Sequence, residues 1–318
     1  MGRRADRARR SARRADLDPG ARRRQPLTPA QDKRLRSLIA KHRVAWLGEL
    51  ADVVQHREGL VFDRGLLAAC QIQVKKLAAL DAAIGHPLWA ALRSIWFADK
   101  FAWDPRIVPL LVDPVMRELR EVTCIGVGHV FVALARHPRP LPITSIWTVD
   151  DAFRSPADSV QQLATAPGLP ALRRLGFTYW GDAPWIVELP IVRRIETLGI
   201  TAEPPSRVWL DRTRRLDHLT TLELRRHWIP IQGPERSHFA MYFTRGKSGE
   251  WSRLRIEPTR HVSPQWLGEE LVGLPADSLE HITVPHAMVA AFRKFRRAEI
   301  VTTGAPEAPK PPVKRKKR

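Results

Sequence analysis

Apolar residues recur along most of the chain in one six-residue pattern. The pattern is a large apolar residue, two variable residues, an apolar residue, one variable residue and a last apolar residue. Eight segments fit it: LAACQI (67–72), LRSIWF (92–97), LREVTC (119–124), ITSIWT (143–148), LRRLGF (172–177), VRRIET (192–197), LTTLEL (219–224) and LEHITV (279–284). The first seven begin 20 to 29 residues apart, about the length of one short strand and a return segment. A unit of this size cannot bury its own apolar face, so neighbouring units must stack. The pattern therefore predicts an α/β solenoid of short parallel strands over residues 60–300.

The segment before the repeats, residues 25–59, is predicted to be an N-terminal helical cap. Thr28 can cap a helix, Pro29 suits its first position, and Gln31 completes a capping box. Two successive apolar runs follow at helical spacing, which predicts two short helices that pack together.

Residues 237–258 depart from the repeat. They alternate apolar and polar residues on both sides of RGKSGE, which predicts a β-hairpin near the C-terminal end of the array. The second half, WSRLRI (251–256), also fits the repeat spacing. Three interpretations remain: a hairpin inserted between repeats, an antiparallel edge that ends the solenoid, or an ordinary irregular repeat.

The strand pattern and its spacing resemble leucine-rich repeats, whose short parallel strands line a curved solenoid. The stretch KHRVAWLGELADVV…LVFDRGLLAACQI (41–54 and 60–72) is also similar to the segment before such arrays in a group of large-genome bacterial proteins, myxobacterial and planctomycete. The resemblance covers roughly residues 35–300. Two departures indicate an irregular array. A basic segment stands where those proteins often carry a small repeat-companion domain, and the Asn that follows the strand in the usual repeat is absent throughout.

The pattern also predicts which side chains could bind a partner. Side chains alternate along a strand, so positions four and six face the core and positions three and five face the opposite, concave side. The candidate protein-binding face consists of Ser94, Trp96, Glu121, Thr123, Ser145, Trp147, Arg174, Arg194, Glu196, Thr221 and Glu223. Trp96 and Trp147 occupy the same position two units apart, and an exposed Trp near Arg is typical of a protein-binding hot spot. The alternative is that the N-terminal helices or a loop cover these two residues, or that irregular repeats turn them into the core.

Motifs for catalysis or cofactor binding are missing from the sequence. The stretch Gly246-Lys247-Ser248 lacks the partner glycine of a phosphate-binding loop, because Met241 stands at that position. There is no G-x-S-x-G, no H-E-x-x-H and no pair of cysteines at metal-binding spacing. We therefore expect no enzyme activity, no cofactor and no metal.

The two cysteines, Cys70 and Cys124, both fall on inward positions of the pattern, two units apart. Two strand spacings place their Cα atoms about 10 Å apart, whereas a disulfide needs about 7 Å or less. Both are expected to be free, buried thiols, which agrees with a reducing compartment. No apolar run is long enough to span a membrane and no signal peptide is evident, so we expect a cytoplasmic protein.

The net charge of +20 is concentrated in two tails that are predicted to be disordered. Residues 1–24 hold ten Arg against three Asp, and residues 301–318 are rich in Pro and Lys. Such tails either bind nucleic acid or ribosomes through charge or simply keep the protein in solution. The sequence thus favours a non-enzymatic scaffold that binds an unknown protein partner through the concave face. The alternative is a nucleic-acid- or ribosome-associated protein held by its basic tails.

Overall fold

The computed structural model describes residues 28–54, 60–73, 77–97, 104–149, 166–178, 184–201, 206–228, 237–258, 274, 277–293 and 295–303. The chain divides into two compact units, residues 1–48 and residues 49–318. Of the two predicted tails, residues 1–24 and 304–318 lie outside the described residues. Residues 301–303 belong to the last strand, so the array extends past the predicted boundary at residue 300.

The described part of the first unit is one long helix, α2 (Pro29–Leu47). Its predicted capping box is confirmed, since the Thr28 side chain accepts from the Gln31 backbone and the Gln31 side chain accepts from the Thr28 backbone. The prediction of two short α-helices was wrong: α2 spans the first apolar run and reaches Leu47 in the second, and Leu50 of the second run lies in a 3-10 turn. The helix ends at Gly48, whose positive φ of 53° suits glycine, and the 3-10 turn, η1 (Gly48–Asp52), follows.

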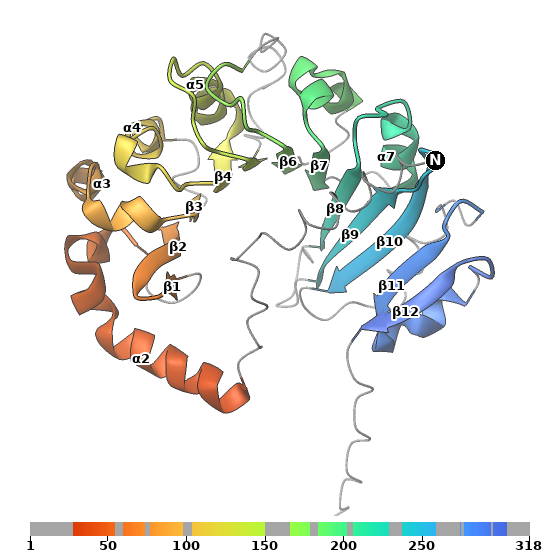
Figure 1. Cartoon of the computed structure of the whole chain (residues 1–318), viewed down its shortest axis with the longest axis horizontal. Helices are drawn as coiled ribbons and strands as arrows, with labels where there is room; N and C mark the ends of the chain where they lie inside the picture. Colours follow the sequence, from red (N-terminus) through yellow and green to blue (C-terminus); the bar gives the residue numbers. More distant parts are fainter. Residues whose placement is uncertain are drawn as a thin grey trace, which may run out of the picture. The chain divides into compact units, whose positions relative to one another are not determined.

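The second unit is built on one twelve-stranded sheet whose strands follow chain order (Figure 1). The strands are β1 (Val61–Asp63), β2 (Leu66–Ile72), β3 (Ser94–Phe97), β4 (Glu121–Gly126), β5 (Ser145–Val149), β6 (Arg174–Thr178), β7 (Thr197–Thr201), β8 (Thr221–Trp228), β9 (Ser237–Arg245), β10 (Trp251–Pro258), β11 (His281–Pro285) and β12 (Glu299–Thr303). Neighbours from β2 to β8 and from β10 to β12 are parallel. The pairs β1–β2, β8–β9 and β9–β10 are antiparallel. The sheet is mostly parallel and not closed, which is compatible with the predicted α/β solenoid-like arrangement.

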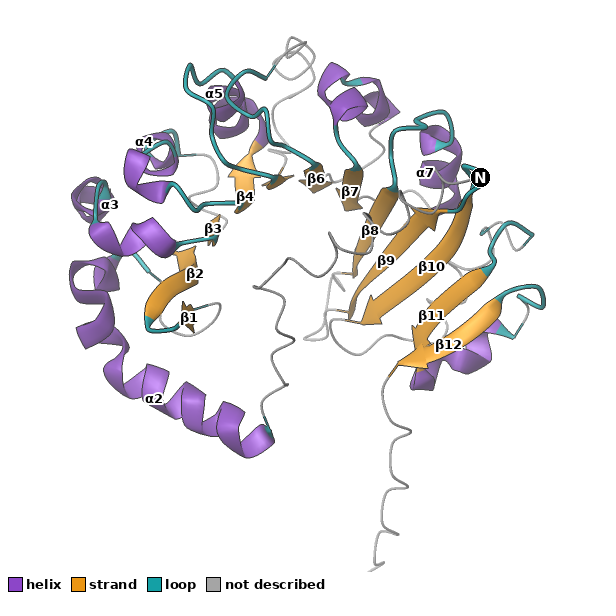
Figure 2. Ribbon diagram, viewed as in Figure 1, coloured by secondary structure: helices purple, strands orange, loops and turns teal. Residues whose placement is uncertain are grey.

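Short helical segments connect the strands and lie along one face of the sheet (Figure 2). They are α3 (Leu77–Ala83), η2 (Pro87–Ala91), α4 (Ile107–Leu111), η4 (Pro114–Met116), the π-helical turn η5 (Val127–Phe131), α5 (Val132–Ala135), η6 (Pro184–Glu188), η7 (Pro190–Arg194), α7 (Ser206–Thr213) and η8 (His286–Phe292). Several begin with proline, which lacks the N–H that would be unsatisfied in a first turn. The prolines that precede many strands in the sequence therefore start the return segments.

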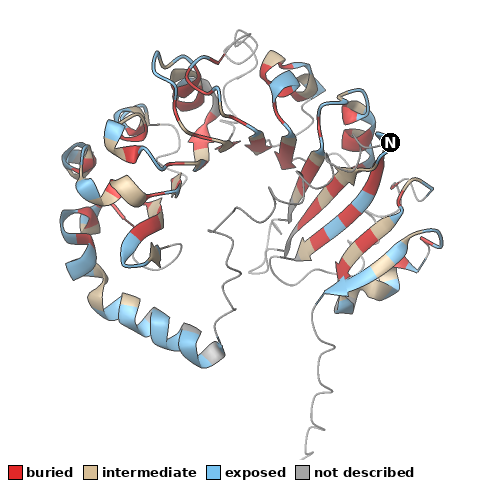
Figure 3. Cartoon of the chain, viewed as in Figure 1, coloured by how far each residue is buried: buried red, intermediate tan, exposed pale blue. Residues whose placement is uncertain are grey.

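The core lies between the sheet and these helical segments. One cross-strand row of apolar side chains is buried from β2 to β11: Cys70, Ile95, Val122, Ile146, Leu175, Leu198, Leu222, Phe243, Leu254 and Ile282. Trp89 of η2 and Trp209 of α7 are fully buried on the helical side. Buried and exposed positions alternate along most of β10, and buried and half-buried positions alternate along part of β9 (Figure 3). Each buried large side chain contributes about 1.5–3 kcal/mol, so stacking supplies the stability that a single repeat lacks.

A repeated backbone contact holds successive units in register. The carbonyl of Arg93 accepts two hydrogen bonds, from the N–H groups of Arg120 and Glu121, both at 2.9 Å. The same pair of bonds recurs at the carbonyls of Arg120, Thr144, Arg173 and Glu196. Because the acceptors are backbone atoms, the register does not require the Asn side chain that this sequence lacks.

Seven of the eight predicted strand segments contain a strand, and VRRIET (192–197) does not. Residues 190–194 form η7, and β7 begins only at Thr197. The physical reason is that the same pattern occurs again three residues later, at Ile195, Leu198 and Ile200, all of which are buried. Leu172 and Leu219 lie 23 and 24 residues from Ile195, so this second match is also the more regular one.

The predicted hairpin over 237–258 is confirmed, and it is inserted between repeats. Strand β9 pairs antiparallel with both β8 and β10, and β10 then pairs parallel with β11. The interpretation as a terminal edge was wrong because β11 and β12 continue the sheet beyond it.

The cysteines differ in their surroundings. Both are reduced thiols. Cys70 is fully buried, and this burial raises the pKa of its thiol far above the usual value. Cys124 is only half-buried, contrary to its predicted inward position. It has a φ of 61° and lies at an irregularity in the pairing of β4 with β5, so that Ile125 takes the buried position instead.

Candidate protein-binding face

The sheet has a second face, opposite the helical segments, which we call the open face. Nine predicted residues project from strands on this side: Ser94, Trp96, Glu121, Thr123, Ser145, Trp147, Arg174, Thr221 and Glu223. The other two, Arg194 and Glu196, do not, because they precede β7. Thr197 and Gly199 occupy the corresponding places.

Trp147 lies on the open face of β5, and it is nearly buried, with 5% of its surface exposed. Its indole lies across two glycines, Gly176 on β6 and Gly199 on β7. A Cβ atom at Gly176 would lie 2.2 Å from the Trp147 ring, and one at Gly199 would lie 2.3 Å from it. The indole Nε1–H donates to the Thr178 hydroxyl at 2.8 Å. The two glycines therefore form a flat slot that holds the ring against the sheet.

Two arginines lie over the same ring. The guanidinium carbon of Arg225 is 3.7 Å from the ring centroid of Trp147, and that of Arg174 is 5.8 Å from it. Such cation–π contacts are strongest where the cation is partly removed from water. The expectation that Trp147 is solvent-exposed was therefore wrong: the ring is on the predicted face, but side chains from neighbouring strands cover it. Trp96, by contrast, is half-buried on β3.

Glu223 holds the two arginines in place. Its side chain is 1% exposed, and its carboxylate accepts hydrogen bonds from Arg225 Nε, at 2.7 Å, and from Arg174 Nη2. Each arginine side chain keeps 34% of its surface exposed. A buried carboxylate needs such partners because an unpaired charge away from water is costly.

The network continues onto the inserted hairpin. Tyr242 on β9 is the cross-strand neighbour of both Glu223 and Arg255. The Arg255 guanidinium lies 4.4 Å from the Tyr242 ring centroid and also pairs with Glu257. Burial raises the pKa of the Tyr242 phenol above its usual value, and the charges of Glu223 and Glu257 raise it further.

We call this group the arginine–aromatic cluster, and its members are Trp147, Arg174, Glu223, Arg225, Tyr242 and Arg255. Sequence reasoning found the first three. Arg225 was missed because β8 was predicted to end at residue 224, whereas it continues to Trp228. Tyr242 and Arg255 were missed because the candidate face was predicted from the repeat pattern alone, and the hairpin departs from that pattern. Their alternation with the buried Met241, Phe243, Leu254 and Ile256 was the available signal.

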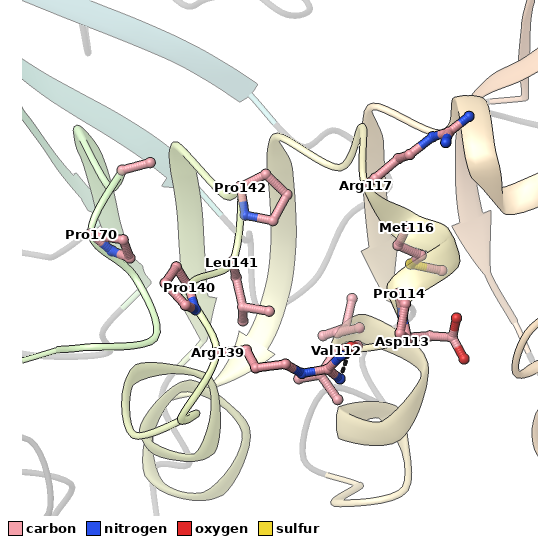
Figure 4. A pocket seen from close by; sticks show the side chains of 12 residues that line it. Val112, Asp113, Pro114, Met116, Arg117, Arg139, Pro140, Leu141, Pro142 and Pro170 are labelled. Atoms are coloured by element: carbon pink, nitrogen blue, oxygen red, sulfur yellow. Dashed lines mark hydrogen bonds between the residues drawn. The ribbon is translucent and has the colours of Figure 1, made fainter.

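A groove of about 490 Å³ lies between successive units near the starts of β4, β5 and β6 (Figure 4). Its lining includes Pro114, Pro140, Pro142 and Pro170 around the buried Leu141. The Arg139 side chain donates to the carbonyl of Val112, at 3.5 Å. This arginine thus bridges two adjacent return segments, and the groove is lined mainly by rigid apolar side chains.

Among the described residues, no cluster of three or more His, Cys, Asp or Glu side chains could hold a metal ion. Within the same parts of the chain, no helix has the length and apolar character needed to cross a membrane.

Comparison with known proteins gives no relative for this chain. No family model, no curated protein and no solved structure matches it.

Proposed function

We propose that this protein is a protein-interaction module that binds its partner on the open face of a leucine-rich-repeat-like solenoid. The observation that carries the proposal is the arginine–aromatic cluster. Tyr and Arg are among the residue types that contribute most to binding energy at protein interfaces, and here arginines lie over the buried ring of Trp147. The arginines and the ring are held in fixed positions by Glu223 and by the glycine slot, which lowers the entropy lost on binding.

The test is affinity capture from a lysate of the cells that produce the protein, with open-face variants of the full chain. Arg255→Glu and Glu121→Arg change exposed side chains on β10 and β4. Each is expected to reduce the captured partner about tenfold or more, because reversing a charge places like charges together at the interface. Arg207→Glu on α7, an exposed residue on the helical side, serves as the control and should leave capture unchanged. Equal capture by all variants would refute the proposal.

The basic tails support a second candidate function, association with nucleic acid or ribosomes. The observation behind it is the excess of Arg in residues 1–24 and of Lys and Arg in residues 304–318. Binding through such tails releases counterions and weakens steeply as salt increases. Removal of both tails should abolish this association and leave capture by the open face intact.

A further inference from the structure

Two arginines of the cluster have N–H groups that make no hydrogen bond with the described residues. Arg225 uses its Nε–H for Glu223, and neither of its Nη groups makes a hydrogen bond within the described part of the chain. Arg174 donates to Glu223 through Nη2, while its buried Nε finds no acceptor there. One carboxylate thus serves two guanidinium groups, and donors remain on both.

Positive charge is also in excess on this part of the open face. Strands β6, β8 and β10 contribute Arg174, Arg225, Arg253 and Arg255, whereas the carboxylates there are Glu223 and Glu257. Arg253 is exposed and has no carboxylate partner among the described residues. The surface therefore carries two uncompensated positive charges beside ordered aromatic rings.

We propose that the arginine–aromatic cluster binds an acidic segment of the protein partner through side-chain carboxylates. This inference rests on the proposed function and names the chemistry of the partner. Guanidinium groups bind carboxylates in a planar, two-point geometry, and an arginine already fixed by Glu223 and Trp147 loses little freedom on binding.

The spacing of the arginines sets the length of the segment. Arg225 and Arg255 stand two strands apart, at least about 10 Å, so a single carboxylate cannot bridge them. An extended chain advances about 3.3 Å per residue and its side chains alternate, so carboxylates four residues apart lie on one side, about 13 Å from each other, and reach both. A peptide can place an uncharged residue opposite Glu257, an acidic residue of the same surface, whereas the regularly spaced phosphates of nucleic acid would meet it.

The experiment titrates the full-length protein with a blocked hexaglutamate peptide and follows the indole N–H signals of its eleven tryptophans by NMR. The Trp147 signal is assigned by its loss in Trp147→Phe. Hexaglutamate is expected to shift this signal to saturation, because a carboxylate on Arg225 changes the charge above the ring. Peptide bound only to the basic tails would leave it unmoved, so the readout is specific to the cluster.

Arg255→Gln and Arg225→Gln are each expected to weaken this titration about fivefold, and Arg207→Gln on α7 should not change it. Arg255 is exposed, so its variant tests the inference even if Arg225→Gln fails to fold. The inference is overturned if the Trp147 signal does not move, if uncharged hexaglutamine moves it equally, or if an oligothymidylate moves it at lower concentration.

The two proposals fail in different ways. Suppose that hexaglutamate has no effect on Trp147 while Arg255→Glu still loses the captured partner. The open face then binds protein through other chemistry, and only the acidic segment is excluded. If no open-face variant changes capture, the proposed function itself is wrong and the inference falls with it.

Discussion

At the scale of single residues, Trp147 shows how a large aromatic ring becomes buried on a sheet face that points away from the core. No helix covers it. The ring is flattened against the backbone where two successive units both carry glycine, and a guanidinium group lies on its outer side. The burial of Trp147 thus depends on residues from β6, β7 and β8 together.

Gly199→Ala is expected to destabilise the protein by about 2 kcal/mol, because its methyl group would overlap the Trp147 ring. The measurement is urea unfolding. In a Trp147→Ala background the same change should be neutral or stabilising, since the ring is gone and alanine restricts the unfolded chain. A similar loss of stability in both backgrounds would mean that the slot is not what excludes a side chain.

The phenol of Tyr242 provides a second prediction at this scale. Its pKa is raised in the folded protein, so its neutral form contributes stability that is present below about pH 10 and is lost as the pH rises further. Glu223→Gln removes a neighbouring negative charge and should lower this pKa, and Glu257→Gln should lower it less.

Phenolate absorbance measures the titration, and Tyr242→Phe identifies which of the two tyrosines gives the signal. An unchanged midpoint in both glutamine variants would show that burial alone raises the pKa.

At the scale of elements, Arg245 ties the inserted hairpin to the repeat before it. Its guanidinium donates to the carbonyls of Thr213, Arg214, Leu216 and Leu219, in the turn between α7 and β8, and to that of Gly249. It also stacks on Trp251 at 4.3 Å. One side chain thus satisfies the carbonyl groups where the chain changes from repeat to hairpin.

Arg245→Ala is therefore expected to lower the free energy of unfolding by about 2 kcal/mol, because several carbonyl groups lose a charged donor. Arg253→Ala, at an exposed position on β10, should cost less than about 0.5 kcal/mol. Arg245→Lys should recover only part of the loss, since an ammonium group cannot reach the same acceptors. Thermal unfolding of the three variants decides this, and equal effects of the two alanine changes would contradict it.

The sequence predicts elements better than it predicts their contacts, for a physical reason. A strand such as β6 is specified locally, because its alternating apolar residues need only a neighbouring face. Two matches to the pattern overlap at 192–200, and the more regular distance to the neighbouring repeats indicates the correct one. The position of Trp147 on the open face was also predictable. Its burial was not, because it requires Gly176, Gly199 and Arg225 to be brought into line by the register of three further strands.

At the scale of the whole molecule, stability is shared between neighbours in a nearly one-dimensional array. Cys70 lies on β2, next to the edge strand β1, and is fully buried, whereas Cys124 is half-buried two strands further on. Modification of the Cys70 thiol therefore measures opening of that end of the array, whereas modification of the Cys124 thiol does not require it.

Under native conditions a thiol reagent should modify Cys124 first and Cys70 at least about a thousandfold more slowly, because Cys70 must wait until that end of the array opens. Cys124→Ser isolates the slow reaction, and low concentrations of urea should accelerate it. Similar rates for the two thiols would show that the end of the array is already open. After denaturation without reductant, both thiols should react.

The direction of the strands has a consequence for how such a chain can change. Strand β9 reverses the sheet and β10 restores it, so β8 and β11 point the same way although two strands stand between them. An insertion of two antiparallel strands, or of any even number, leaves the direction of all later strands in the sheet unchanged. Because crossovers between parallel strands are right-handed, a single added strand would place the helical segments of all later units on the opposite face of the sheet. Growth and loss in such an array should therefore proceed by whole repeats or by pairs of strands, and the hairpin that contributes Tyr242 and Arg255 to the open face is one such pair.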